Sequence, residues 1–268
     1  RAGAGWYGIG QLSVAETLWQ QALAIYEKLV PNSLEMASTL GNLGTIAYSR
    51  GDLARAEQLY QQALAIFEQL APNSLQVASA LNNLGLVASN RGDLARAEQL
   101  FQQALAIKEQ LAPNSLQVAS TLHNLGHVAS DRGDLARAEQ YYQQALAIYE
   151  KLAPNSLEVA STLNNLGIVA SNRGDLARAE QLFQQALAIR EKLAPNSLQV
   201  ARTLHNLGRV ASDRGDLARA EQLFQQALAI QEKLAPNSLE VAHTLHNLGR
   251  VASDRGDLAR AEQLFQQA

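Results

Sequence analysis

The sequence repeats itself every 41 residues, and this period constrains the fold more than any other feature. The string Gly-Asp-Leu-Ala-Arg-Ala-Glu-Gln occurs six times, and all six prolines keep the same 41-residue step between Pro31 and Pro236. A fixed period of this length is typical of proteins that stack one small structural unit many times. The string begins at Gly51, Gly92, Gly133, Gly174, Gly215 and Gly256.

Each unit is predicted to form two helices. In the unit of residues 72–112, Asn73 is the expected N-cap of the first helix, and Gln76 would complete a capping box. Gly92 is expected to end this helix in a turn, and Asp93 to cap the second helix. Apolar and small residues recur at helical spacing in both helices: Leu75, Ala78, Leu81, Leu84, Gly85 and Ala88, then Leu94, Ala97, Phe101, Ala104, Leu105 and Leu111.

One helix hairpin of this kind cannot bury both of its apolar faces, but a stack of hairpins can. The small residues Gly85, Ala97 and Ala104 would let the paired helices approach closely. The sequence therefore predicts an all-α solenoid in which each repeat contacts its neighbours.

Composition narrows the function. The formal net charge of −3 argues against a nucleic-acid-binding protein, which needs a basic surface to displace counterions from phosphates. The absence of cysteine excludes disulfides, thiolate metal sites and a cysteine nucleophile. No apolar run approaches the ~20 residues that span a bilayer, and no signal peptide is visible. We expect a cytoplasmic protein that binds neither nucleic acid nor membrane.

Three short patterns suggest functions that their context does not support. Residues 3–8 fit G-x-G-x-x-G, but a dinucleotide site needs a preceding strand and a βαβ unit. Arg-Gly-Asp, as at residues 91–93, is explained at every copy by glycine as the turn and aspartate as the helix cap, rather than by cell adhesion. Ser120, His123 and Asp131 cannot form a catalytic triad, because Asp131 would lie about 12 Å along the helix axis from His123.

Two histidine pairs could each reach one metal ion. His123 and His127, and likewise His243 and His246, lie about one helical turn apart. No third ligand accompanies either pair, whereas three or four ligands are the norm. We expect no metal site, no cofactor and no catalytic residues.

The small and apolar positions of each unit match a known signature. In one unit they are Leu81, Leu84, Gly85, Ala88, Gly92, Ala97, Phe101 and Ala104. Over the whole chain this spacing resembles the tetratricopeptide repeat (TPR) family, although the usual unit has only ~34 residues. The longer unit resembles the repeats of kinesin light chains and of bacterial arrays attached to CHAT domains or NTPase signalling proteins. The resemblance implies a right-handed superhelix of antiparallel helix pairs.

We expect a single solenoid domain over residues 1–268. It would comprise a partial repeat at residues 1–30, five full repeats and a truncated repeat at residues 236–268. Neither end carries a polar capping helix, so we expect part of a longer protein, and end-to-end self-association through the uncapped ends. The full repeats would span residues 31–71, 72–112, 113–153, 154–194 and 195–235.

Most positions are identical between copies, so the few that differ stand out. Three of them lie in the first helix of each unit at offsets 0, 3 and 7, which places them on one helical face. The family resemblance implies that first helices line a peptide-binding groove, so this variable stripe would form its wall. The three positions read Ser38/Ser79/Ser120/Ser161/Arg202/His243, then Gly41/Asn82/His123/Asn164/His205/His246, then Thr45/Leu86/His127/Ile168/Arg209/Arg250.

An invariant asparagine follows the middle position of the stripe. An exposed asparagine contributes nothing to a core, but its amide offers a donor and an acceptor to a peptide backbone. In kinesin light chains an asparagine at the matching place holds a bound peptide, and the resemblance implies the same role here. The alternative is that these residues persist from recent duplication. This asparagine ladder comprises Asn42, Asn83, Asn124, Asn165, Asn206 and Asn247.

The candidate groove changes character along the chain. Its amino-terminal half offers neutral or apolar residues, whereas its carboxyl-terminal half is rich in arginine and histidine. That half should attract an acidic peptide, more strongly below about pH 6.5 as the histidines become charged. Besides the asparagine ladder, the candidate groove residues are Leu86, His123, His127, Ile168, Arg202, His205, Arg209, His243, His246 and Arg250.

A further variable position lies late in the second helix and changes from aromatic to polar along the chain. We expect it on the convex or edge surface. It is occupied by Tyr26, Phe67, Lys108, Tyr149, Arg190 and Gln231.

The sequence thus predicts a non-enzymatic scaffold whose groove binds a protein or an extended peptide segment, as the recognition or regulatory part of a larger protein. The alternative is a purely structural or self-associating array, including an engineered, consensus-like one, with no specific ligand. High identity between the copies is compatible with both.

Overall fold

The computed structural model describes the backbone of residues 9–268 and the side chains of residues 12–268. The G-x-G-x-x-G motif at residues 3–8 lies outside the described residues. The described residues form thirteen α-helices and no strand. The helices are α1 (Ile9–Leu29), α2 (Leu34–Ser49), α3 (Leu53–Leu70), α4 (Leu75–Asn90), α5 (Leu94–Leu111), α6 (Leu116–Asp131), α7 (Leu135–Leu152), α8 (Leu157–Asn172), α9 (Leu176–Leu193), α10 (Leu198–Asp213), α11 (Leu217–Leu234), α12 (Leu239–Asp254) and α13 (Leu258–Gln267).

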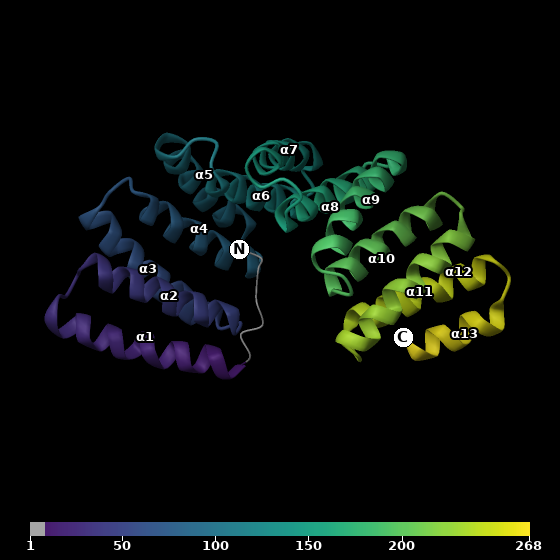
Figure 1. Cartoon of the computed structure of the whole chain (residues 1–268), viewed down its shortest axis with the longest axis horizontal. Coiled ribbons are helices and arrows are strands. Elements are labelled where there is room, and N and C mark those ends of the chain that lie inside the picture. The colour runs from purple at the N-terminus through teal and green to yellow at the C-terminus, as the bar shows by residue number, and fades with distance from the viewer. Residues whose placement is uncertain (1–8) are drawn as a thin grey trace. The chain divides into compact units, whose positions relative to one another are not determined.

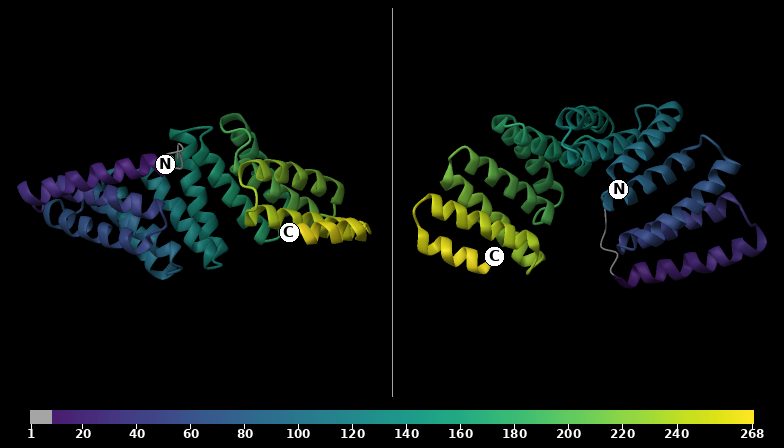
Figure 2. Two further views of the ribbon diagram at one scale, coloured as in Figure 1. Left: turned by 90° about the horizontal axis from the view of Figure 1, so that it is seen from below. Right: turned by 180° about the vertical axis from the view of Figure 1, so that it is seen from behind.

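The chain divides into two compact units, Arg1–Ile148 and Tyr149–Ala268, and the division falls within α7. In each unit, successive helices run antiparallel and stack in pairs (Figures 1 and 2). Each 41-residue repeat supplies one pair, such as α4 and α5 from residues 72–112. The predicted all-α helical solenoid is thereby confirmed, while a single domain over residues 1–268 stays a prediction.

The caps of the first helices differ from the sequence prediction by one residue. Ser74, not Asn73, caps α4, because its hydroxyl accepts a hydrogen bond from the Val77 amide at 3.3 Å. Asn73 instead takes a left-handed conformation with φ 53°, which asparagine tolerates better than most residues. The capping box does not form, because Gln76 stands two residues after the cap instead of three.

The turn between paired helices follows the prediction. Gly92 has φ 81°, and the Asp93 carboxylate accepts a hydrogen bond from the Arg96 amide at 3.1 Å. The predicted close approach is also present, because a Cβ at Gly85 would lie 2.6 Å from a ring carbon of Phe101. Arg-Gly-Asp is therefore a helix end, a turn and a cap.

An ion-pair clamp between repeats was not predicted from the sequence. Glu57 of α3 pairs with Arg91 and Arg96 of the next repeat. The arginines are half-exposed, so each pair contributes at most about 1 kcal/mol. The same clamp recurs at Glu16, Glu98, Glu180 and Glu221.

Apolar side chains are exposed on the outermost helices of the described chain. Leu18 and Ile25 of α1 are more than half exposed, and so are Leu239 of α12 and Leu258 of α13. End-to-end association through such surfaces stays a prediction. Among residues 9–268, no helix is both long enough and apolar enough to cross a membrane.

Candidate functional site

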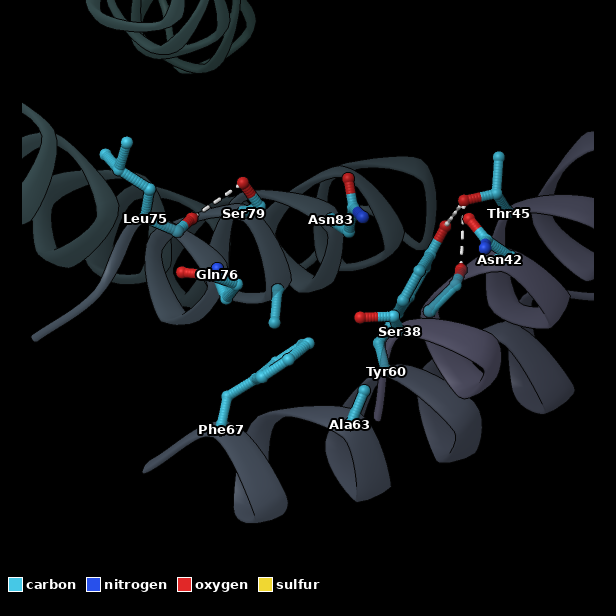
Figure 3. Close-up of a pocket in the computed structure, with 12 residues that line it drawn as sticks. Ser38, Asn42, Thr45, Tyr60, Ala63, Phe67, Leu75, Gln76, Ser79 and Asn83 are labelled. Atoms are coloured by element: carbon cyan, nitrogen blue, oxygen red, sulfur yellow. Dashed lines mark hydrogen bonds between the residues drawn. The ribbon is translucent and has the colours of Figure 1, made fainter. Parts of the chain in front are cut away.

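A pocket of about 300 Å³ opens between two consecutive repeats in the first unit. We call the contact of α2, α3 and α4 the first junction, and that of α4, α5 and α6 the second junction. In the first junction, α2 and α4 form the walls of the pocket and α3 forms its floor (Figure 3). The lining residues are Ser38, Gly41, Asn42, Thr45, Tyr60, Ala63, Phe67, Leu75, Gln76, Ser79, Ala80 and Asn83.

The pocket brings together residues that the sequence analysis grouped on one face. All three stripe positions of α2 line it, beside the ladder residue Asn42. Asn83, the ladder residue of the next repeat, lies on the opposite wall (Figure 3). The predicted shared face of the stripe and the ladder is therefore confirmed at this junction.

The polar groups around the pocket fall into two classes. The hydroxyl of Tyr60 donates to Thr45 Oγ1 at 3.1 Å, and the Thr45 hydroxyl donates to the carbonyl oxygen of Gly41 at 3.0 Å. Burial raises the pKa of Tyr60, so this hydroxyl stays a donor at neutral pH. In contrast, the side-chain amides of Asn42 and Asn83 form no hydrogen bond with any other described residue. These two amides are available to a ligand.

The second junction has the same backbone plan but a polar bridge in the corresponding space. Lys108 Nζ donates to Thr121 Oγ1 at 2.7 Å, and Thr121 Oγ1 lies 3.2 Å from Asn82 Oδ1. Asn124 Nδ2 also donates to Asn82 Oδ1, at 3.4 Å. Lys108 is only 4% exposed and forms no ion pair with any residue that the structure describes. Burial lowers its pKa to about 8.

The α8–α9–α10 junction of the second unit is built like the second junction. Arg190 donates to Thr203 Oγ1, to the Gln199 carbonyl at 3.1 Å and to Asn164 Oδ1 at 3.4 Å. Asn206 Nδ2 donates to the same Asn164 oxygen at 3.3 Å. Burial, and secondarily the nearby positive charge of Arg202, lowers the pKa of Arg190 to about 10.

The expected surface location of the variable position in the second helices is therefore wrong. The side chain at that position faces the next repeat. At Gln231, burial leaves the side-chain oxygen Oε1 without a hydrogen-bond partner among the described residues. The buried members of this variable position are Phe67, Lys108, Tyr149, Arg190 and Gln231.

The expectation that the asparagine ladder stands free in solvent is wrong for most of it. Asn42 is exposed, whereas the other five ladder residues are half-buried. Asn124 and Asn206 bond to the preceding repeat, as described above, and Asn247 Nδ2 donates to His205 Nε2 at 3.1 Å. The ladder therefore includes residues that join repeats, so the amide side chain does not by itself mark a binding site.

His205 is held as a neutral ring. Its Nε2 accepts from Asn247, and its Nδ1 lies 2.9 Å from Thr244 Oγ1, whose own proton goes to the Glu240 carbonyl. The proton of the ring therefore sits on Nδ1. Burial, and then the charges of Arg209 and His243, lowers the pKa of His205 to about 4. The prediction that His205 charges below about pH 6.5 is wrong.

His123, His127 and His246 each contact a side chain outside the two predicted histidine pairs. His123 stacks edge-on against Tyr142 with ring centroids 5.3 Å apart, and burial first and His127 second lower its pKa to about 4. His127 Nδ1 instead lies 3.0 Å from Asp131 Oδ2. His246 stacks against Phe265 at 5.3 Å. In the described part of the chain, no group of three histidine, aspartate or glutamate side chains is arranged to hold an ion.

The other predicted residues are dispersed. Arg202 Nη2 pairs with Glu240 Oε1 at 3.0 Å, so its charge is partly satisfied. Ile168, Asn206 and Arg209 surround a hollow of only about 10 Å³, which holds no more than one water. Leu86 packs against the cluster around Phe101, while Arg209, His243 and Arg250 are exposed. Attraction of an acidic partner to the second unit stays a prediction.

A sequence model described as "Tetratricopeptide repeat" matches residues 7–69, 76–151, 158–233 and 200–268, which together cover nearly the whole chain. The chain belongs to the tetratricopeptide repeat family. This TPR fold is generally a non-catalytic scaffold, and it typically mediates protein interactions. No curated protein gives a significant sequence match.

Solved structures share the TPR architecture. BtubC (BKLC) from P. vanneervenii is 25% identical with a TM-score of 0.71, over 85% of this chain and 93% of that one. A Podosopora anserina protein, described as a kinesin light chain with nearly identical TPR-like repeats, is 21% identical with a TM-score of 0.63, over 77% and 99%. The apo form of RapI is 18% identical with a TM-score of 0.74, over 96% and 89%. The expected resemblance to TPR repeats of the kinesin light chain kind is confirmed.

Three residues of the pocket stand differently against the sequence prediction: Gly41 belongs to the predicted stripe, Phe67 was expected on the surface, and Ala80 was not predicted. Phe67 and Ala80 lie on its floor and wall, and Gly41 leaves it open, since a Cβ there would meet no atom within 4 Å. Each is an exception among its copies, because Gly41, Phe67 and Ala80 are the only glycine, phenylalanine and alanine at their repeat positions. The sequence alone shows that these three residues differ from their copies, but only the structure shows that the three positions lie around one pocket.

Proposed function

We propose that this TPR chain is a non-catalytic, protein-binding scaffold that receives an extended peptide segment of a partner across its first helices, with the first junction as the principal contact. The observation that carries the proposal is the pocket of about 300 Å³, flanked by the amides of Asn42 and Asn83, which bond to no other residue in the described part of the chain. Each amide offers both a donor and an acceptor, which suits capture of an extended backbone.

The proposal is narrower than a groove lined by all six ladder asparagines. Asn124, Asn206 and Asn247 already bond to the preceding repeat. One N–H of each of these three amides is therefore already used between repeats. The amide of Asn83 has no such bond to the preceding repeat, because Gly41 offers no side chain to it.

Selection from a random peptide library displayed on phage tests this function. Enriched peptides, made synthetically, should bind the wild-type chain and lose about tenfold in affinity for Asn42→Ala/Asn83→Ala, because two hydrogen bonds of about 0.7 kcal/mol each are lost. Gln61→Ala/Gln102→Ala is the matched control, since among the described residues these exposed amides bond only to a glutamate on their own helix. Absence of enrichment, or equal affinity for both double variants, would overturn the proposal.

A further inference from the structure

We propose that the pocket of the first junction receives one uncharged, apolar side chain of leucine to phenylalanine size from the bound segment, and that Gly41, Phe67 and Ala80 determine this specificity. The inference rests on the proposed function, because it names what the partner segment must present. The test of the inference uses small molecules, so that the inference and the proposed function can be contradicted independently.

The volume fits one such side chain. A cavity of about 150 Å³ lined by apolar groups is large enough to bind benzene. The pocket offers about 300 Å³, which leaves space for a leucine or phenylalanine side chain and part of its backbone. The ring of Phe67 and the side chain of Ala63 supply apolar contacts (Figure 3), and Leu75 also lines the pocket.

The electrostatics exclude a charged side chain. None of the lining residues is charged. A lysine or aspartate side chain entering the pocket would lose its hydration without gaining a counter-charge, and this costs far more than burying an apolar group. The amides of Asn42 and Asn83 lie on opposite walls, where they can bond the backbone that carries the side chain (Figure 3).

The comparison with the second junction shows how the pocket arises. Asn82, Lys108 and Thr121 occupy the positions that Gly41, Phe67 and Ala80 hold one repeat earlier. These three polar residues bond to one another across the junction. All three members of the bridge are replaced in the first junction, so the space is open and its floor is aromatic.

The polar bridge can therefore be transplanted as a test. In Gly41→Asn/Phe67→Lys/Ala80→Thr, each new residue is the one that the next repeat carries at the same place, so the fold has a precedent for all three. If the triple variant has a lower melting temperature than the wild type, the single variant Gly41→Asn replaces it in the test. The probes are the methylamides of N-acetyl-leucine, N-acetyl-phenylalanine, N-acetyl-aspartate and Nα-acetyl-lysine. The readout is the methyl NMR shift of Leu75, which lines the pocket.

The leucine and phenylalanine probes should shift Leu75 saturably, with a Kd of roughly 1–10 mM for ligands of this size. The aspartate and lysine probes should bind at least about tenfold more weakly. The transplant should remove the shift. Equal shifts with all four probes, or an unchanged titration in both variants, would overturn the inference.

The reciprocal variant is expected to gain probe binding at the second junction. In Asn82→Gly/Lys108→Phe/Thr121→Ala the second junction acquires the open arrangement, and Leu116 takes the place of Leu75. The leucine probe should then shift Leu116 as well, whereas no shift of Leu116 is expected in the wild type. A folded variant without this second response would contradict the assigned role of the three residues. If library peptides bind through Asn42 and Asn83 while no probe shifts Leu75, the inference fails and the proposed function stands.

Discussion

The first and second junctions share one backbone arrangement, and they differ in the side chains that lie between the two repeats. Both close a glycine against an aromatic ring, Gly44 against Tyr60 and Gly85 against Phe101. Both are clamped by a glutamate with two arginines. The first has an uncharged pocket, whereas the second contains a buried ammonium, that of Lys108. A shared scaffold therefore leaves a few interior positions free to set the chemistry of each junction.

The buried ammonium gives the largest expected effect. The ordinary pKa of lysine is 10.5, and that of Lys108 in the fold is about 8. Below pH 8 the charge destabilises the fold in full. Between pH 8 and 10.5 the unfolded chain holds a proton that the folded chain has lost, so rising pH favours folding. The stability of wild type relative to Lys108→Met should rise by about 3 kcal/mol across this window.

Urea unfolding of both proteins from pH 7 to 10.5 measures this difference, and groups common to both cancel. Parallel pH profiles would show that the ammonium of Lys108 is not desolvated, and the contrast between the junctions would lose its electrostatic basis.

Two glycines of one helix should respond with opposite signs. A Cβ at Gly44 would lie 2.7 Å from a ring carbon of Tyr60, so Gly44→Ala should destabilise by about 2 kcal/mol. A Cβ at Gly41 meets nothing within 4 Å, so Gly41→Ala should stabilise by about 0.5–1 kcal/mol through the lower entropy of the unfolded chain. Denaturation midpoints compare the two. A loss of stability in both would mean that the pocket above Gly41 is filled.

Removal of the Thr121 hydroxyl tests the polar bridge that only the second of the two junctions contains. Thr121→Ala leaves the ammonium of Lys108 without its hydrogen-bond acceptor and should cost about 1.5 kcal/mol. The same change in Lys108→Met should cost clearly less, and this double-mutant cycle measures the coupling. Additive costs would indicate that the polar bridge does not exist in solution.

The ion-pair clamp should give the smallest effect and the same one in both junctions. Glu57→Gln and Glu98→Gln should each cost about 0.5 kcal/mol, and the cost should shrink in high salt. Thermal melts at two salt concentrations suffice. Unequal costs would show that the scaffolds of the two junctions differ beyond the interior residues.

The sequence predicted the scaffold because its determinants are local and repeated. Gly92 and Asp93 form the turn and the cap, and Gly85 meets Phe101, as their spacing implied. The predicted cap of α4 is wrong by one residue, since Asn73 and Ser74 are both good N-caps. Asn73 occupies the left-handed turn before the helix, so Ser74 is the cap.

The candidate site was predicted only in part. The stripe and the ladder do meet at the pocket beside Asn42 and Asn83. The change from aromatic to polar along the chain predicts a surface location for the position of Phe67 and Lys108, but both side chains are buried against the next repeat. Which face of a second helix contacts the next repeat depends on the stacking of repeats, and the period alone does not reveal it.

The location of a bound side chain tests the central proposal most directly. A library-selected peptide can be mixed with protein carrying ¹³C-labelled leucine methyl groups, and intermolecular NOEs can be recorded to Leu75 and Leu116, the same position in consecutive repeats. The proposed function predicts NOEs from the bound peptide to Leu75 of the first junction. NOEs from the peptide to Leu116 and none to Leu75 would contradict it.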